Sequence, residues 1–241
     1  MDFSLIIVAI VVILIVVVLV GTFGGDQSRS SLKSAHNGKT PDVIPASKLP
    51  GHKNSNDYTW SFWIYVNNWN YNYGTKKVII KRSGEGGLSC PEIYLDENKN
   101  DLLVDISTYD PTGTSKDSAK VTTRVRNIPL QKWTYVVVTT SGLSVDVYLD
   151  GKLRRTSLLP NPAKIVANAD IELCPKIDAN NPGFSGFLSK INYFARSVNP
   201  REVYSMYKGG FSPGWGSSLM NRFKFRFQFE KDGEEISSFA I

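Results

Sequence analysis

Apolar and polar residues alternate with a period of two along much of the chain. In residues 145–150, valine and leucine occupy every second position between polar or amphipathic residues. Because successive side chains of a strand point to opposite faces of a sheet, this pattern predicts a strand with one buried face. Asp150-Gly151 follows, a pair that tolerates positive φ in a two-residue hairpin turn. We therefore predict that residues 131–156 form a β-meander.

Apolar runs bounded by turn-forming residues predict further strands elsewhere in the chain. They fall at residues 58–66, 77–82, 91–95, 102–106, 120–125, 170–174, 183–194 and 222–230. In the last of these, RFKFRFQFE, four phenylalanines share one face and charged or polar residues share the other. Short strands at fairly regular intervals are typical of a sandwich of two sheets. The predicted fold class is therefore all-β, with two antiparallel sheets.

One helix is predicted after the strands, over residues 199–208. Asn199 can cap its start, Pro200 suits the first helical position, and Glu202 completes a capping box. Gly209 stands where a glycine commonly ends a helix.

The N-terminus carries a run of sixteen consecutive apolar residues, from Leu5 through Ile10 and Ile15 to Val20. With its uncharged neighbours the run reaches the ~30 Å needed to span a bilayer as a helix. A cleaved signal peptide is the competing interpretation, but it would have Lys or Arg before the run, and only Asp2 is charged there. We therefore predict one uncleaved transmembrane helix and a single-pass membrane protein.

These patterns divide the chain into four segments. We predict an anchor over residues 1–25, a linker over 26–56, a β-sandwich over 57–210 and a C-terminal β extension over 211–241. The linker assignment rests on a composition rich in Ser, Lys, Asn, Gly and Pro, without an apolar period.

Composition and charge narrow the choice of partner only a little. The net charge of +6 favours anionic surfaces such as lipid head groups, nucleic acid or acidic glycans, and selects none of them. No recognised nucleic-acid motif interleaves basic and aromatic residues, so we expect no nucleic-acid partner. Cys90 and Cys174 are too few for a disulfide scaffold, and a bridge between them requires Cα atoms within about 7 Å, which the sequence leaves open.

Three segments together resemble a concanavalin A-like lectin/glucanase domain of the laminin G-like type. They are the aromatic strand at 58–66, the core at 133–152 and the closing segment at 183–209. The matching positions of the closing segment are Gly186, Ile191, Tyr193, Arg196, Pro200, Glu202, Val203, Tyr207 and Gly209. The resemblance implies a jelly roll of two curved antiparallel sheets. It implies function only weakly, because the family includes lectins, adhesion modules, glycosidases and structural proteins.

The sequence offers little for catalysis or for a metal. The glucanases of this family carry an E-x-D-x-E triplet on one strand, and no such triplet occurs here, so we expect no enzyme. The only histidines, His36 and His52, fall in the predicted linker. No cofactor is expected. Calcium is the family's usual metal, and its candidate ligands, which are equally ordinary turn residues, are Asp96, Asp101, Asp110, Asp117 and Asp178.

Two surface segments are candidates for binding. The loop NNWNYNY could hold a glycan on aromatic rings and amides, or pack on the domain or a protein partner; its candidate residues are Asn67, Trp69, Asn70, Tyr71 and Tyr73. The C-terminal strand carries a basic face, with Arg222, Lys224 and Arg226. Solvated strand faces explain most such basic clusters.

The order of anchor, laminin G-like domain and basic aromatic extension is similar to that of membrane-anchored virion proteins of large DNA viruses. On that resemblance we expect a minor capsid protein that links an internal virion membrane to the capsid shell through protein contacts. The alternatives are a membrane-tethered lectin or adhesion module and, less favoured, a glycoside hydrolase.

Overall fold

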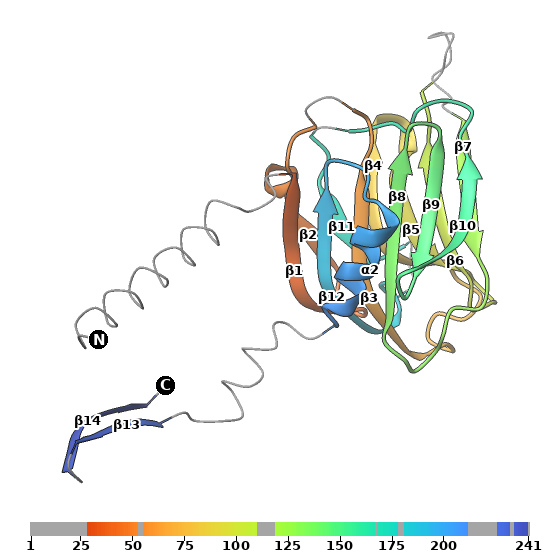
Figure 1. The fold of residues 1–241 in the computed structure, drawn as a ribbon. Coiled ribbons are helices and arrows are strands. Elements are labelled where there is room, and N and C mark those ends of the chain that lie inside the picture. Colours follow the sequence, from red (N-terminus) through yellow and green to blue (C-terminus); the bar gives the residue numbers. More distant parts are fainter. Residues whose placement is uncertain are drawn as a thin grey trace.

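Two six-stranded antiparallel sheets stack face to face in the computed structural model (Figure 1). The structure describes residues 28–52, 55–109, 119–166, 168–177 and 181–211, together with the strands at 226–231 and 234–240. The predicted all-β sandwich of two antiparallel sheets is therefore confirmed. Within these residues, no helix is long and apolar enough to cross a membrane, and the anchor predicted over residues 1–25 lies outside them.

The strands divide evenly between the two sheets. In spatial order, the first sheet contains β1 (Arg29–Asn37), β12 (Ser185–Phe194), β3 (Thr59–Asn68), β8 (Thr134–Ser141), β9 (Ser144–Leu149) and β10 (Lys152–Leu158). The second contains β2 (Asp42–Ile44), β11 (Ile171–Leu173), β4 (Lys77–Gly84), β5 (Leu88–Leu95), β6 (Leu102–Ser107) and β7 (Lys120–Val125). Short 3-10 turns lie at Ala46–Lys48 and Glu85–Gly87. Apart from residues 26–56, the predicted strands within the described part of the domain match this set.

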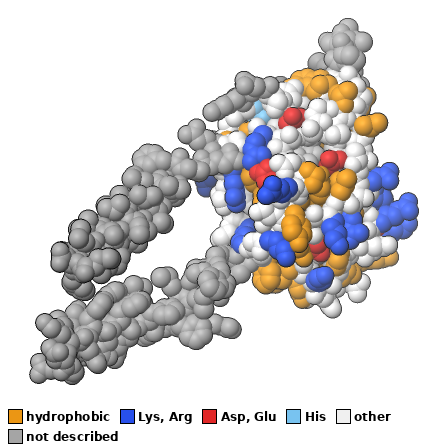
Figure 2. Space-filling view, viewed as in Figure 1, with side chains coloured by type: hydrophobic (Ala, Val, Ile, Leu, Met, Phe, Trp, Pro, Cys, Tyr) orange, Lys and Arg blue, Asp and Glu red, His pale blue; other side chains and the backbone are white. Residues whose placement is uncertain are grey.

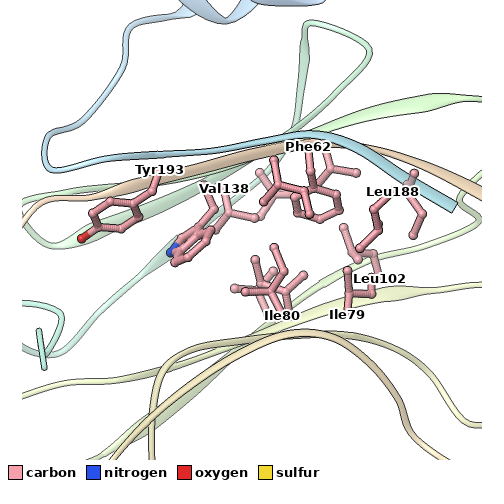
Figure 3. Packing of buried hydrophobic residues seen from close by; sticks show 14 of the residues in the cluster. Phe62, Ile79, Ile80, Leu102, Val138, Leu188 and Tyr193 are labelled. Atoms are coloured by element: carbon pink, nitrogen blue, oxygen red, sulfur yellow. The ribbon is translucent and has the colours of Figure 1, made fainter. Parts of the chain in front are cut away.

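The hydrophobic core lies between the two sheets. Phe62, Val138 and Leu188 of the first sheet face Ile80 and Leu102 of the second, and all five are fully buried (Figure 3). The alternating residues that predicted buried strand faces supply these side chains. Apolar burial on this scale is the main term that holds such a sandwich together.

A second, smaller cluster lies on the outer face of the first sheet, beneath α2 (Pro200–Lys208) (Figure 1). Val203 of the helix packs there against Trp63, Tyr135 and Tyr148. The helix thus covers the outward side chains of the central strands, which explains why β8 is buried along nearly its whole length. The helix has the predicted cap, with the Asn199 side chain accepting a hydrogen bond from the Glu202 N–H. The predicted capping box is not formed, because the Glu202 carboxylate pairs with Arg196 instead.

The meander and its turn also form as predicted. β8, β9 and β10 pair in sequence. Asp150 and Gly151 have positive φ values of 50° and 77°. This is the conformation predicted for an Asp-Gly dipeptide in a two-residue turn between strands.

The segment 26–56, which we interpreted as a linker, needs correction. β1 pairs along its length with β12, and β2 pairs with β11, so both sheets gain an edge strand from this segment. His36 is consequently a strand residue and is buried. Serine, lysine and asparagine dominate β1 because an edge strand is largely exposed and needs few apolar residues.

The C-terminal strand predicted over residues 222–230 is described from Arg226 onward. β13 (Arg226–Lys231) pairs with β14 (Glu234–Ala240) in a separate two-stranded sheet. The division of the chain into four segments otherwise stays a prediction.

Candidate functional site

One end of the sandwich gathers several loops around a pocket. Lys77, Leu95, Leu102 and Val125 pair across the second sheet in a single row, so the connections that adjoin them lie at the same end. The first sheet contributes the end of β3 and the start of β8. Between these loops is a pocket of about 770 Å³, here called the end pocket. Its walls are formed by Trp69, Asn98, Lys99, Asn100, Asp101, Arg124, Arg126, Asn127 and Leu130.

Two carboxylates fix the floor of the end pocket. Nη1 of Arg124 lies 3.0 Å from a carboxylate oxygen of Asp96 and 3.0 Å from one of Asp101. Asp101 is only 3% exposed. Burial opposes ionisation of Asp96, but the N–H groups of Asn98 and Lys99 and the Arg124 guanidinium outweigh it, so its pKa lies below the ordinary value. Both carboxylates are thus committed to holding the loops.

Hydrogen bonds fix two of the asparagines that line the end pocket. Asn127 adopts a left-handed φ of 56°, and its N–H donates to Asp101 over 3.0 Å. Nδ2 of Asn100 donates to the Ile128 carbonyl over 3.1 Å. These bonds join the β5–β6 turn to the β7–β8 connection. These two connections therefore form one bonded wall of the pocket.

Trp69 forms the aromatic wall of the end pocket. Its ring packs partly against the core, and the Nζ of Lys77 lies 4.6 Å from the ring centroid. Lys77 is 1% exposed, and its ammonium donates to the Glu97 carbonyl over 3.1 Å. Burial lowers the pKa of Lys77 against the opposing effect of Asp96 and Glu97. A cation under the indole thus holds Trp69 in place.

The remaining candidates of the NNWNYNY loop do not line the end pocket. Tyr71 donates its hydroxyl to the Pro182 carbonyl over 3.0 Å, and Lys39 lies over its ring. Tyr73 is 62% exposed. Asn67 and Asn70 are exposed too, and the Asn70 N–H donates to Oδ1 of Asn68 over 2.9 Å. Trp69 is therefore the residue of this loop that lines the end pocket, and Tyr71 packs against the fold. For the exposed residues, contact with a glycan or with a protein partner stays a prediction.

The two cysteines do not form the bridge that the sequence left open. Cys90 and Cys174 are both free and buried, at 2% and 0% exposure. Burial raises the pKa of Cys90 to about 11 and that of Cys174 to about 12. They behave as small core residues.

The described residues provide no metal site. No group of three or more His, Cys, Asp or Glu side chains in the described part of the chain could hold an ion. Among the calcium candidates, Asp96 and Asp101 hold Arg124, whereas Asp110, Asp117 and Asp178 lie outside the described residues.

Of the predicted basic face, Arg222 and Lys224 also lie outside the described residues, and for Arg226 only the backbone is described.

Sequence reasoning missed most of the end pocket. Asn98, Asn100 and Asn127 lie in turns, where asparagine is common for conformational reasons alone. The left-handed backbone of Asn127 is the feature that sets it apart, and it is visible only in the structure.

Comparison with known proteins supports the fold. The model of the family described as the concanavalin A-like lectin/glucanases superfamily matches residues 38–204. No curated protein matches the sequence significantly.

Solved structures with a similar fold include botulinum neurotoxin binding domains. The binding domain of botulinum neurotoxin DC in complex with rat synaptotagmin II superposes with a TM-score of 0.54 at 16% identity, covering 70% of this chain and 40% of the neurotoxin chain. The receptor binding domain of botulinum neurotoxin D gives 0.51 at 14%, covering 75% and 43%. The DC binding domain in complex with SialylT gives 0.50 at 15%, covering 70% and 39%.

The match thus spans less than half the length of these neurotoxin chains, and at this identity it shows a shared fold only. The family model covers more than half of the present chain. This protein therefore belongs to the concanavalin A-like lectin/glucanase superfamily.

Proposed function

We propose that this protein is a non-catalytic binding module that holds a carbohydrate in the end pocket. The observation that carries the proposal is the presence of an indole, several amides and a guanidinium in one ordered pocket. Ligand sites of this type combine an apolar surface with a few convergent polar groups. Membership of a superfamily that includes lectins, and the likeness to neurotoxin binding domains, support the proposal.

Each wall of the pocket suits a different part of a sugar. The Trp69 ring offers a flat apolar surface to the C–H face of a pyranose ring. The amides of Asn98 and Asn127 can donate to and accept from hydroxyl groups. Arg126 is exposed at the rim and adds positive charge, whereas Asp101 is already paired with Arg124. The pocket therefore favours a neutral or acidic sugar over a basic one.

The proposal is tested by screening the full chain against a glycan array. Trp69→Ala should weaken binding to the best glycan by about tenfold or more, since a buried aromatic contact is commonly a dominant one. Tyr73→Ala is the matched control, because Tyr73 belongs to the same loop but is 62% exposed and does not line the end pocket. Equal binding by the parent protein and Trp69→Ala would refute a site at the end pocket.

The second candidate is the role as a membrane-anchored minor capsid protein that the terminal segments predict. A specific observation favours protein contacts: aromatic side chains of β12, of α2 and of the segment after α2 are exposed. Phe187 and Tyr204 are each 48% exposed, and Phe211, at 43%, stacks on Trp133 with ring centroids 4.9 Å apart. Aromatic residues are enriched in protein interfaces. In this candidate the anchor lies in an internal virion membrane.

Crosslinking of the native assembly tests the second candidate. It should join the face around Phe187 to a capsid protein, and membrane fractionation should place the chain with a lipid bilayer. Recovery of the chain only outside assembled particles would exclude the capsid role.

A further inference from the structure

Four arginines from two different sheets line a groove beside the end pocket. Arg124 and Arg126 come from β7 and the residue after it, and Arg154 and Arg155 come from β10. With Val125 they enclose about 360 Å³, here called the arginine groove. β7 and β10 are the edge strands of the second and first sheets, so the groove follows the open side of the sandwich. Figure 2 shows lysine and arginine side chains gathered on that side of the domain.

The strands themselves aim these side chains outward. In β7, Thr123 and Val125 are buried, so the alternate residues Arg124 and Arg126 face solvent. In β10 the pairing with β9 shifts between Leu153 and Arg155. A bulge of this kind leaves one residue unpaired and redirects its side chain. Arg154 is that residue, which allows two consecutive arginines to line one groove.

Among the described residues, one of the four groove arginines is paired with carboxylates. Arg124 pairs with Asp96 and Asp101. Within the described part of the chain, Arg126, Arg154 and Arg155 have no carboxylate in salt-bridge distance. Like charges held side by side destabilise the domain unless an anion lies between them. The guanidinium fork is also the side-chain group best matched to carboxylate, sulfate or phosphate.

We propose that the arginine groove binds the acidic groups of an extended anionic glycan whose chain continues from the end pocket. The inference rests on the proposed function and names its ligand class. Arg124 and Arg126 line both the end pocket and the arginine groove, so one ligand chain can occupy both without a break. The sugar rings would contact Trp69 in the end pocket, and the acidic substituents would lie along Arg154 and Arg155.

The lining favours a glycan over other polyanions. Single-stranded nucleic acid is held by several aromatic side chains on which successive bases stack, whereas Trp69 is, among the described residues, the one aromatic residue that lines the end pocket and the arginine groove together. The indole and amides that continue the groove suit sugar rings and hydroxyl groups. An acidic peptide would place a ring on the Trp69 indole only if it also carried an aromatic residue.

The test compares polymers that share a backbone but differ in charge. The full chain is titrated with short dextran sulfate, with uncharged dextran of the same length, with polyglutamate and with single-stranded DNA. We expect dextran sulfate to bind the most tightly. The double variant Arg154→Gln/Arg155→Gln should bind it roughly tenfold more weakly and with a smaller dependence on salt, because two charge contacts are lost. The control Lys48→Gln/Arg201→Gln removes the same charge from exposed sites outside both pockets and should bind like the parent protein.

The outcomes separate this inference from the proposed function. If Trp69→Ala weakens binding while Arg154→Gln/Arg155→Gln does not, the end pocket binds sugar and the groove inference is wrong. If the arginine variant alone weakens binding, the groove holds the anion by itself and the proposed function of the end pocket is wrong. Tighter binding of polyglutamate or DNA than of dextran sulfate would overturn the glycan assignment. Equal loss in the Lys48/Arg201 control would show that only net charge matters, which also overturns it.

Discussion

Gly186 provides the sharpest test of how the first sheet is assembled. A Cβ at this position would lie 1.9 Å from the Tyr65 carbonyl oxygen and 2.7 Å from the Phe184 ring, whereas ordinary contacts begin at 3.4 Å. Gly186→Ala must therefore push β12 away from β3 at the point where Gly186 pairs with Val66. Overpacking costs about 1–3 kcal/mol, and each weakened backbone hydrogen bond costs about 0.5–1.5 kcal/mol more. We expect a loss of about 2–5 kcal/mol.

Urea denaturation followed by tryptophan fluorescence measures this loss. For a domain of this size the same change should lower Tm by roughly 5–20 °C. Gly51→Ala is the control, because no atom lies within 4 Å of a Cβ built there and its φ is not positive. It should leave the free energy of unfolding within about 0.5 kcal/mol of the parent value or raise it slightly. Equal stability of Gly186→Ala and Gly51→Ala would refute the close approach of β12 to β3.

Four further predictions concern other parts of the domain. Asn199→Ala removes the side-chain acceptor at the start of α2 and should lower the free energy of unfolding by about 1 kcal/mol in the same assay; no change would argue against the cap. Asp101→Ala leaves Arg124 with one carboxylate and should lower the free energy of unfolding by about 2 kcal/mol. It should also weaken glycan binding, and unchanged binding would contradict this prediction. Burial raises the pKa of the Cys90 and Cys174 thiols, so neither should react with a thiol reagent in the native protein at pH 8, and both should react in urea. The thiols ionise near pH 9.0 in the unfolded chain and near 11 and 12 in the folded protein. The contribution of the neutral thiols to the free energy of unfolding is therefore intact below pH 9 and is lost as the pH rises toward the folded values. Cys90→Ala/Cys174→Ala should reduce the fall in the free energy of unfolding between pH 9 and the folded values.

Much of the fold followed from local pattern. Period-two alternation identified the strands of the domain core, Asp150-Gly151 identified a hairpin turn, and Asn199 marked the start of α2. These features depend on residues close together in the sequence, which is why the sequence reveals them. β1 and β2 escaped prediction because exposed edge strands carry no apolar period, and their pairing with β12 and β11 spans more than a hundred residues.

Long-range pairing decided which residues form the end pocket and the arginine groove. Trp69 is the only candidate of its loop that lines the end pocket, because Tyr71 is held by Pro182 across the fold. The basic clusters at Arg124 and Arg154 are separate and unremarkable in the sequence. They face one groove because β7 and β10 are the edge strands on the same side of two stacked sheets.

The sequence by itself therefore determined the class of fold, the strands and the turns, because alternation, turn residues and capping residues act over a few positions. Only the tertiary structure decided which turns meet at one end of the sandwich and which charges lie side by side. Those contacts depend on sheet order and on the stacking of the two sheets, and no local pattern along the chain encodes either.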